Sequence, residues 1–189
     1  MPAERAYVPG MAPRLMTAEE LLHTRIPDKR TELVKGVLVV REPAGGRHGS
    51  VTINLTIRLG THVERTRAGQ LFAAETGFRL SREPDTVRAP DLAFVRRERL
   101  PEAIPTGFPE FAPDLVVEVL SPDDRPGEVL AKVGDWLDSG VRLVWVIDPA
   151  RRIARVYRQD GSQASLGEDE QLDGEDVLVG FSCTLAAVL

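Results

Sequence analysis

Apolar residues recur along the chain with two different spacings. One set stands four residues apart and predicts the buried face of a long helix that stops near Gly69; its members are Val51, Leu55, Leu59 and Val63. Residues 115–120 (LVVEVL) instead form a nearly continuous apolar run, typical of a strand that is buried on both faces of a sheet. Residues 142–148 (RLVWVID) form a second such run. The two spacings together indicate a sheet covered by helices.

Capping and turn residues predict a short helix and two hairpins. Thr17, with Glu20 three positions later, forms a capping box at the start of a short helix. Lys35-Gly36 and Asp160-Gly161 each stand between two short strand-like segments, and each therefore predicts a β-hairpin.

A further helix is predicted between the two apolar runs. It extends from about Glu128 to Ser139 and ends at Gly140, the residue type that is preferred just past a helix end. Asp123 or Asp124 is available to cap its start. Its predicted core stripe consists of Leu130, Val133 and Leu137.

The order of these elements indicates the fold class. A helix, a hairpin and a long helix precede two strand-like segments, residues 69–80 and 89–97, that flank a turn, and a strand–helix–strand unit follows. This order predicts an α/β or α+β domain whose mixed central sheet is flanked by helices. Residues 1–16 show no such pattern, so we expect a flexible leader and then a single domain over residues 17–189.

The composition is that of an ordinary globular protein. Hydrophobic residues make up 42% and charged residues 28% of the 189 positions, which argues against a disordered chain. No apolar run approaches the roughly 18 residues of a membrane span, and the N-terminus has no signal-peptide core, so we expect a cytoplasmic protein with no membrane partner. Cys183 is the only cysteine, which excludes an internal disulfide and a cysteine-based zinc site.

Negative charge is concentrated in one segment. The formal net charge is −5, and six acidic residues fall within residues 168–176. Removing those six charges would leave +1, so the rest of the molecule is close to neutral and a basic groove is allowed there. We interpret the acidic segment itself as a solvated loop.

Glu118 is the charged residue within the apolar run 115–120. A buried carboxylate loses its hydration and needs an arginine, a raised pKa or a metal ion. The chain has five Pro-Asp dipeptides, and three of them stand in turns or polar loops, at Asp28, Asp85 and Asp123. Asp114 lies about 13 Å from Glu118 on the same strand, which makes a shared ion difficult. Asp91 opens a different apolar run, DLAFV, so Asp91 and Glu118 are the pair that we expect to bind a metal ion.

Lysine usage draws attention to one helical residue. The chain has three lysines against 21 arginines, and Lys132 is the only lysine after residue 35. It borders the predicted core stripe, one turn before Trp136. A lysine where arginine is the usual cation suggests a need for a compact ammonium group whose pKa can shift. An ordinary solvated lysine is the alternative.

Four segments carry a resemblance: APDLAFV, DLVVEVLSPDD, the helix with Lys132, and GVRLVWVIDPARR. They resemble the Uma-two family of restriction-endonuclease-like proteins, a branch of the PD-(D/E)XK nuclease superfamily. TELVKGVLVV and the RHGS helix start are similar to that family as well. The resemblance covers about residues 16–160 and implies a restriction-endonuclease-like core.

The resemblance also implies roles for individual residues. Asp91 corresponds to the aspartate of the PD element and Glu118 to the acid of the (D/E)XK element, so both would bind Mg²⁺ or Mn²⁺. The lysine expected two residues after that acid is replaced by Leu120, and Lys132 matches the position from which the family supplies it. Glu32 matches a family glutamate that joins the carboxylate cluster.

These roles imply a metal-dependent endonuclease that hydrolyses phosphodiester bonds in DNA, in which Lys132 would hold or deprotonate the attacking water. The alternatives are an inactive nuclease-fold module that binds nucleic acid or protein, and a metal-dependent hydrolase of another phosphoester. The acidic composition and the missing lysine at Leu120 support the inactive module. By analogy with the superfamily, we expect a homodimer.

Three further residues are candidates for contact with nucleic acid. His48 stands at the start of the long helix, where the family also has a histidine, although a surface or capping role is the favoured interpretation. Arg96 and Arg97 follow the strand that Asp91 opens and are available to contact phosphates, with a solvated turn as an equal alternative.

Overall fold

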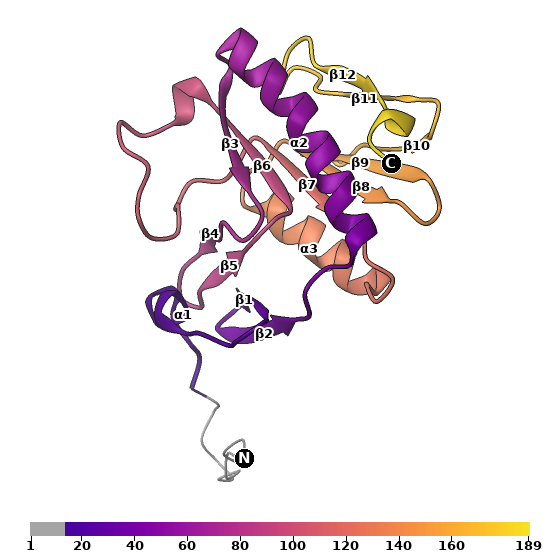
Figure 1. Ribbon diagram of the computed structural model, residues 1–189. Coiled ribbons are helices and arrows are strands. Elements are labelled where there is room, and N and C mark those ends of the chain that lie inside the picture. Colours follow the sequence, from indigo (N-terminus) through magenta and orange to yellow (C-terminus); the bar gives the residue numbers. More distant parts are fainter. Residues whose placement is uncertain (1–13) are drawn as a thin grey trace.

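Two helices cover opposite faces of a mixed six-stranded sheet (Figure 1). The computed structural model describes residues 14–189. Within this part of the chain, β7–β8 is the parallel ladder of the sheet and the other ladders are antiparallel. The strands run in the order β10 (Gln163–Gly167), β9 (Ile153–Arg158), β8 (Leu143–Asp148), β7 (Leu115–Val119), β6 (Leu92–Arg96) and β3 (Gly69–Ala73). The predicted mixed sheet flanked by helices is confirmed.

A smaller antiparallel sheet lies beside the first one, at the bottom of Figure 1. Its strands run in the order β2 (Val37–Arg41), β1 (Arg30–Val34), β5 (Thr86–Arg88) and β4 (Phe78–Ser81), and the short helix α1 (Ala18–His23) packs against β1. Two residues, Ala89 and Pro90, connect β5 to Asp91 and then to β6. The start of β6 is therefore held next to the smaller sheet, and this junction positions the candidate site.

Helix α2 (Gly46–Thr66) covers one face of the large sheet, as the four-residue spacing predicts. The buried stripe packs against side chains of the central strands, among them Leu92, Val117 and Trp145; its members are Val51, Leu55, Leu59 and Val63. The helix ends before the predicted Gly69 because Arg67 adopts the left-handed conformation, with φ of 54°.

Helix α3 (Pro126–Asp138) covers the opposite face and connects β7 to β8. The predicted stripe is wrong at Leu130, which is 55% exposed, whereas Val133 and Trp136 are buried. The reason is that the large indole of Trp136 packs on Phe78, with ring centroids 6.3 Å apart, and turns this side of the helix toward the sheet.

The predicted aspartate cap of α3 is also wrong. The N-cap residue is Arg125, which makes no side-chain capping bond, and a proline occupies the first turn. The Asp124 carboxylate instead accepts a hydrogen bond from the backbone N–H of Ser121 at 2.7 Å. The carboxylate therefore closes the loop before the helix.

The capping box and both hairpins are confirmed. The Thr17 hydroxyl accepts from the N–H of Glu20 at 3.2 Å, and the Glu20 carboxylate accepts from the N–H of Thr17 at 2.9 Å. In the first hairpin, Lys35 and Gly36 both have positive φ, 48° and 76°, which suits a two-residue turn between twisted strands. Strands β9 and β10 form the second hairpin around Gly161.

The sequence patterns did not predict the shortest elements. β5 and the β11 (Gln171–Asp173) and β12 (Ser182–Thr184) pair have three residues each, too few to display a period. The loop interpretation of the acidic segment is wrong at β11, where Leu172 is fully buried. Its acids lie largely at the surface, where Glu168 pairs with Arg152 and Asp176 with Arg142. Two 3₁₀ turns, η1 (Arg97–Arg99) and η2 (Leu185–Ala187), complete the described elements.

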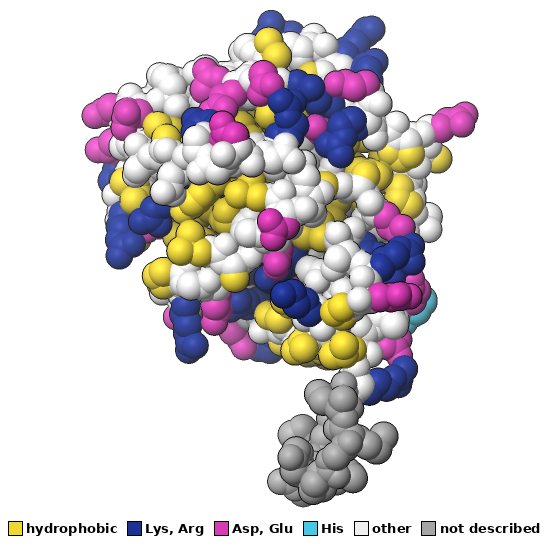
Figure 2. Space-filling view, turned by 180° about the vertical axis from the view of Figure 1, so that it is seen from behind, with side chains coloured by type: hydrophobic (Ala, Val, Ile, Leu, Met, Phe, Trp, Pro, Cys, Tyr) yellow, Lys and Arg dark blue, Asp and Glu magenta, His cyan; other side chains and the backbone are white. Residues whose placement is uncertain are grey.

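Seen from behind, hydrophobic side chains gather in the middle of the face and charged ones lie above and below them (Figure 2).

None of the helices within residues 14–189 is long and apolar enough to cross a bilayer. Most of the predicted leader, residues 1–13, lies outside the described residues. The single domain over residues 17–189 stays a prediction.

Candidate metal and catalytic site

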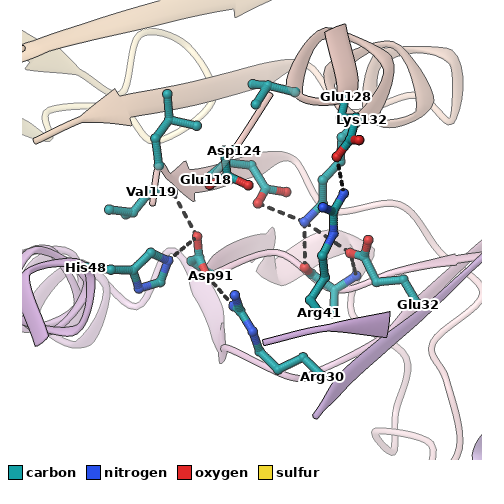
Figure 3. Close-up of a pocket in the computed structure, with 13 residues that line it drawn as sticks. Arg30, Glu32, Arg41, His48, Asp91, Glu118, Val119, Asp124, Glu128 and Lys132 are labelled. Atoms are coloured by element: carbon teal, nitrogen blue, oxygen red, sulfur yellow. Dashed lines mark hydrogen bonds and ion pairs between the residues drawn. The ribbon is translucent and has the colours of Figure 1, made fainter. Parts of the chain in front are cut away.

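A pocket opens where the smaller sheet meets the start of β6, the end of β7 and the two covering helices (Figure 3). It has a volume of about 80 Å³, which leaves room for several water molecules. Residues far apart in the sequence converge on it: Arg30, Glu32, His48, Asp91, Glu118 and Lys132.

Asp91 and Glu118 meet because β6 and β7 pair in one register. Leu92 lies opposite Val117 in this antiparallel ladder, and the N–H of Asp91 donates to the carbonyl of Val117 at 3.1 Å. Asp91 directly precedes Leu92 and Glu118 directly follows Val117, so the two acids face each other one position beyond the ladder. The backbone N–H of Val119 then donates to Asp91 Oδ2 at 2.7 Å. The two acids that the sequence paired are therefore neighbours.

Asp91 is buried beside a histidine and an arginine. His48 Nε2 lies 3.1 Å from Asp91 Oδ2, and an Arg30 nitrogen lies 3.5 Å from Asp91 Oδ1. Burial by itself would raise the pKa of Asp91, but the hydrogen bond and charge of His48 and the N–H of Val119 outweigh it and lower the pKa. Asp91 is thus held as a carboxylate.

Glu118 is buried with one donor on each carboxylate oxygen. Lys132 Nζ donates to Oε2 at 2.9 Å, and the indole N–H of Trp136 donates to Oε1 at 2.8 Å. Burial nevertheless raises the pKa of Glu118 from 4.5 to about 7, with Lys132 opposing the rise and the charges of Asp91 and Glu32 adding to it. The negative charge of this side chain is therefore only partly compensated by the protein.

Lys132 reaches from α3 into the carboxylate cluster. Its ammonium lies 3.0 Å from Glu32 and 2.9 Å from Glu118, and it donates to the carbonyl of Ala89 at 2.9 Å. Burial would lower the pKa of Lys132, but attraction to Glu118 and Glu32 outweighs burial and raises the pKa above its ordinary value. Lys132 therefore keeps its proton at neutral pH.

Both carboxylate oxygens of Glu32 are engaged by the protein. Oε2 accepts from Arg88 at 2.9 Å, and Oε1 accepts from the N–H of Ala89 at 2.9 Å and lies near Lys132. Arg88 in turn binds Asp135 of α3 at 2.6 Å. Burial would raise the pKa of Glu32, but Lys132 and Arg88 outweigh it and lower the pKa. This network connects β1, β5 and α3 beneath the pocket.

The donor set fits a hard divalent cation that keeps part of its water shell. Across residues 14–189, no three His, Cys, Asp or Glu side chains are grouped closely enough to form a metal site by themselves. Mg²⁺ is usually bound by only one or two carboxylates, together with waters and substrate phosphates. Asp91 and Glu118 supply two, and a cation would favour the charged form of Glu118, whose pKa is raised by burial and by the charges of Asp91 and Glu32.

Comparison with known proteins identifies the family and the fold of this chain. The model of the Uma2 family, described as "Putative restriction endonuclease", matches residues 18–186. This chain belongs to the Uma2 family. A similar solved structure is that of "a putative nuclease belonging to DUF820" from Anabaena variabilis, with a TM-score of 0.79 and 20% sequence identity over 92% of this chain and 97% of that chain. That likeness confirms the restriction-endonuclease-like fold. No curated protein matches the chain significantly.

The three residues predicted to contact nucleic acid do not lie together in this Uma2 protein. The surface interpretation of His48 is wrong, because the side chain is buried against Asp91. Arg96 ends β6, about 17 Å along the strand from Asp91, and Arg97 begins η1 directly after it. Their side chains donate to the backbone carbonyls of residues 177 and 67. A role in binding nucleic acid stays a prediction for both arginines.

Sequence reasoning missed three residues of the Uma2 site: Arg30, Arg88 and Trp136. Arg30 stands two positions before Glu32 on β1, so the period of a strand places both side chains on one face. Trp136 stands four positions after Lys132, on the same side of α3. These two spacings could have predicted that Arg30 and Trp136 lie in the site, whereas no local pattern distinguishes Arg88 from the other arginines.

Proposed function

We propose that this protein is a metal-dependent endonuclease that hydrolyses phosphodiester bonds in DNA. Membership of the Uma2 family supports a nuclease-like function. The observation that carries the proposal is the convergence of Asp91 and Glu118 from adjacent strands on one pocket, with the Lys132 ammonium 2.9 Å from Glu118. Carboxylate pairs of this kind suit Mg²⁺ or Mn²⁺.

Asp91 and Glu118 would hold the cation. When bound, a divalent ion polarises a phosphodiester oxygen and lowers the pKa of a coordinated water. His48 holds the Asp91 carboxylate in place, and Trp136 does the same for Glu118. Each acid is thereby oriented by a neighbour from one of the two covering helices.

Lys132 would act as a cation and not as a base. Its raised pKa keeps the ammonium protonated, so of the two roles expected from the sequence, holding the water remains and deprotonating it does not fit. A fixed ammonium beside the carboxylate pair would offset charge that builds on the phosphate. It would take the place of the lysine missing at Leu120.

Glu32 would position Lys132 and would not bind the metal ion. Both of its oxygens already accept hydrogen bonds, and the Arg88 contact at 2.9 Å fixes its orientation. Within the carboxylate cluster, its proposed role is therefore at the ammonium, 3.0 Å away.

Plasmid cleavage tests the proposal. Wild-type protein should nick or linearise supercoiled DNA with Mg²⁺ or Mn²⁺, and EDTA or Asp91→Ala should abolish the cleavage. Asp123→Ala is the matched control, because Asp123 is an exposed Pro-Asp aspartate outside the pocket. Cation binding without cleavage of any nucleic acid would favour a hydrolase of another phosphoester, and absence of cation binding would favour an inactive binding module. Size measurement in solution tests the expected homodimer.

A further inference from the structure

Arg30 occupies a distinctive place in the pocket. It is the first residue of β1 and shares a strand face with Glu32, and Figure 3 shows its guanidinium directed toward Asp91. The side chain lines the pocket and remains 34% exposed. It is therefore accessible to a molecule that enters the pocket, although it also touches a proposed metal ligand.

The donors of Arg30 are poorly used by the protein. A guanidinium carries five N–H donors in a planar fork. Among residues 14–189, Arg30 makes one side-chain contact, the 3.5 Å approach to Asp91, and its buried Nε has no acceptor. Arg88 and Arg41, which also lie near the pocket, make contacts of 2.6 Å and 2.8 Å to carboxylates. Arg30 is thus a cation beside the pocket with capacity for a further anionic acceptor.

Phosphate is the anion that this arrangement suits. The planar fork of arginine binds two phosphate oxygens at once, which a point-like ammonium does not do. Lys132 contacts Glu118 and Arg30 contacts Asp91, so one cation lies against each acid of the pair. The nearby acids would repel either anion, but a phosphate has enough oxygens to contact Arg30 and a cation held by Asp91 and Glu118 at the same time, whereas the fork of Arg30 would occupy both oxygens of a carboxylate.

We propose that Arg30 binds the non-bridging oxygens of a substrate phosphate in this pocket. The identity of the phosphate as part of a DNA backbone rests on the proposed function, whereas binding of a phosphate group does not. The competing role is a structural one, in which Arg30 only neutralises Asp91.

Separate measurements of anion and metal affinity distinguish these roles. Arg30→Gln should weaken binding of inorganic phosphate at least tenfold by isothermal titration calorimetry, while Mn²⁺ affinity is unchanged or slightly higher because a repelling cation is lost. Arg30→Lys should fall between Arg30→Gln and wild type, since it keeps the charge and loses the fork. The matched control is Arg151→Gln, an arginine with a 69% exposed side chain that lies outside the pocket.

The outcomes separate this inference from the nuclease proposal. Phosphate binding that depends on Arg30, without cleavage of DNA, supports the inference and defeats the nuclease proposal. DNA cleavage together with phosphate binding that is absent, or equal in Arg30→Gln and wild type, overturns the inference alone. A tenfold loss of Mn²⁺ affinity in Arg30→Gln would also overturn it, because Arg30 would then act by holding Asp91. Should Arg30→Gln fail to fold, the comparison of Arg30→Lys with wild type decides.

Discussion

Two Pro-Asp dipeptides that lie six residues apart hold their carboxylates with different partners. Asp85 and Asp91 are almost equally buried, 6% and 5% exposed. Arg79 binds both oxygens of Asp85 at 2.8 Å, and the N–H of Ala18 adds a bond at 2.7 Å. Asp91 instead shares its pocket with four further acids; His48 lies 3.1 Å from it and an arginine approaches it only to 3.5 Å.

The comparison separates a structural acid from a candidate catalytic acid. The partners of Asp85 are complete, and Arg79 and Ala18 lower its pKa although burial opposes them. The pKa of Asp91 is lowered as well, but in its pocket burial raises the pKa of Glu118 to about 7, with the charges of Asp91 and Glu32 adding to the rise. Asp114 follows the Asp85 pattern, since Arg99 binds it at 2.8 Å. A second buried acid in the same pocket, with a raised pKa, therefore marks the candidate site, since Asp85 and Asp91 are equally buried themselves.

The largest expected difference is between Asp91→Asn and Asp85→Asn. Asp91→Asn should reduce DNA cleavage by about a thousandfold, because a ligand of the cation is lost, and should change stability little. Asp85→Asn should destabilise the fold by roughly 2–3 kcal/mol, because buried Arg79 loses its bidentate partner and keeps only the exposed carboxylates of Glu19 and Glu110. Cleavage assays and urea denaturation of both variants measure the contrast. Equal loss of stability in the two variants would remove the distinction.

Lys132→Met should have the next largest effect. Loss of the ammonium should reduce cleavage about a hundredfold, since charge on the phosphate is no longer offset. Mn²⁺ affinity should stay equal or rise, because a cation that competes for Glu118 is gone. Lys29→Met, which removes an ion pair with Glu42 outside the pocket, is the control. A parallel loss of Mn²⁺ affinity would contradict the role of Lys132 as a cation for the phosphate.

Metal affinity should depend on pH through Glu118. With its pKa raised to about 7, Glu118 must lose a proton before it binds a cation, so Mn²⁺ affinity should rise about tenfold per pH unit up to about pH 7 and then level off. Calorimetric titrations between pH 5.5 and 8 (about the range needed to bracket this pKa) measure the slope.

Stability should change in the opposite sense. Between about pH 4.5 and 7 the folded carboxyl of Glu118 keeps a proton that the unfolded chain has released. Its contribution to stability therefore falls as pH rises through this window. Glu118→Gln should gain roughly 1–3 kcal/mol relative to wild type between pH 5 and 7.5 (approximate limits of that window). A stability difference that is independent of pH would show that the pKa of Glu118 is not raised.

The smallest effect is expected from Trp136→Phe. Loss of the indole donor disfavours the charged form of Glu118, so the pH at which Mn²⁺ affinity is half maximal should move upward by about 0.5. Trp145→Phe is a matched control, since Trp145 is equally buried but its indole N–H has no acceptor within residues 14–189. Equal pH profiles for both variants would assign Trp136 to packing alone.

Much of the site could be predicted from local signals. Glu118 is conspicuous because a charge interrupts an apolar strand, and Asp91 because it opens another. His48 was interpreted as a surface residue because its burial depends on Asp91, 43 positions away in the chain. Arg88 was missed since its two partners come from β1 and α3, and no local pattern connects them.

The sequence by itself determined the long helices, the central strands and the turns between them, because these depend on neighbours within a few positions. The stripe from Val51 to Val63, the Thr17 capping box and the Lys35-Gly36 turn are of this kind. Tertiary structure alone decided which buried aspartate receives a complete set of partners. The register of β6 on β7 and the placement of α3 bring Lys132 to Glu118. Contacts between distant segments decide which charges meet, and the spacing of residues along the chain does not reveal those contacts.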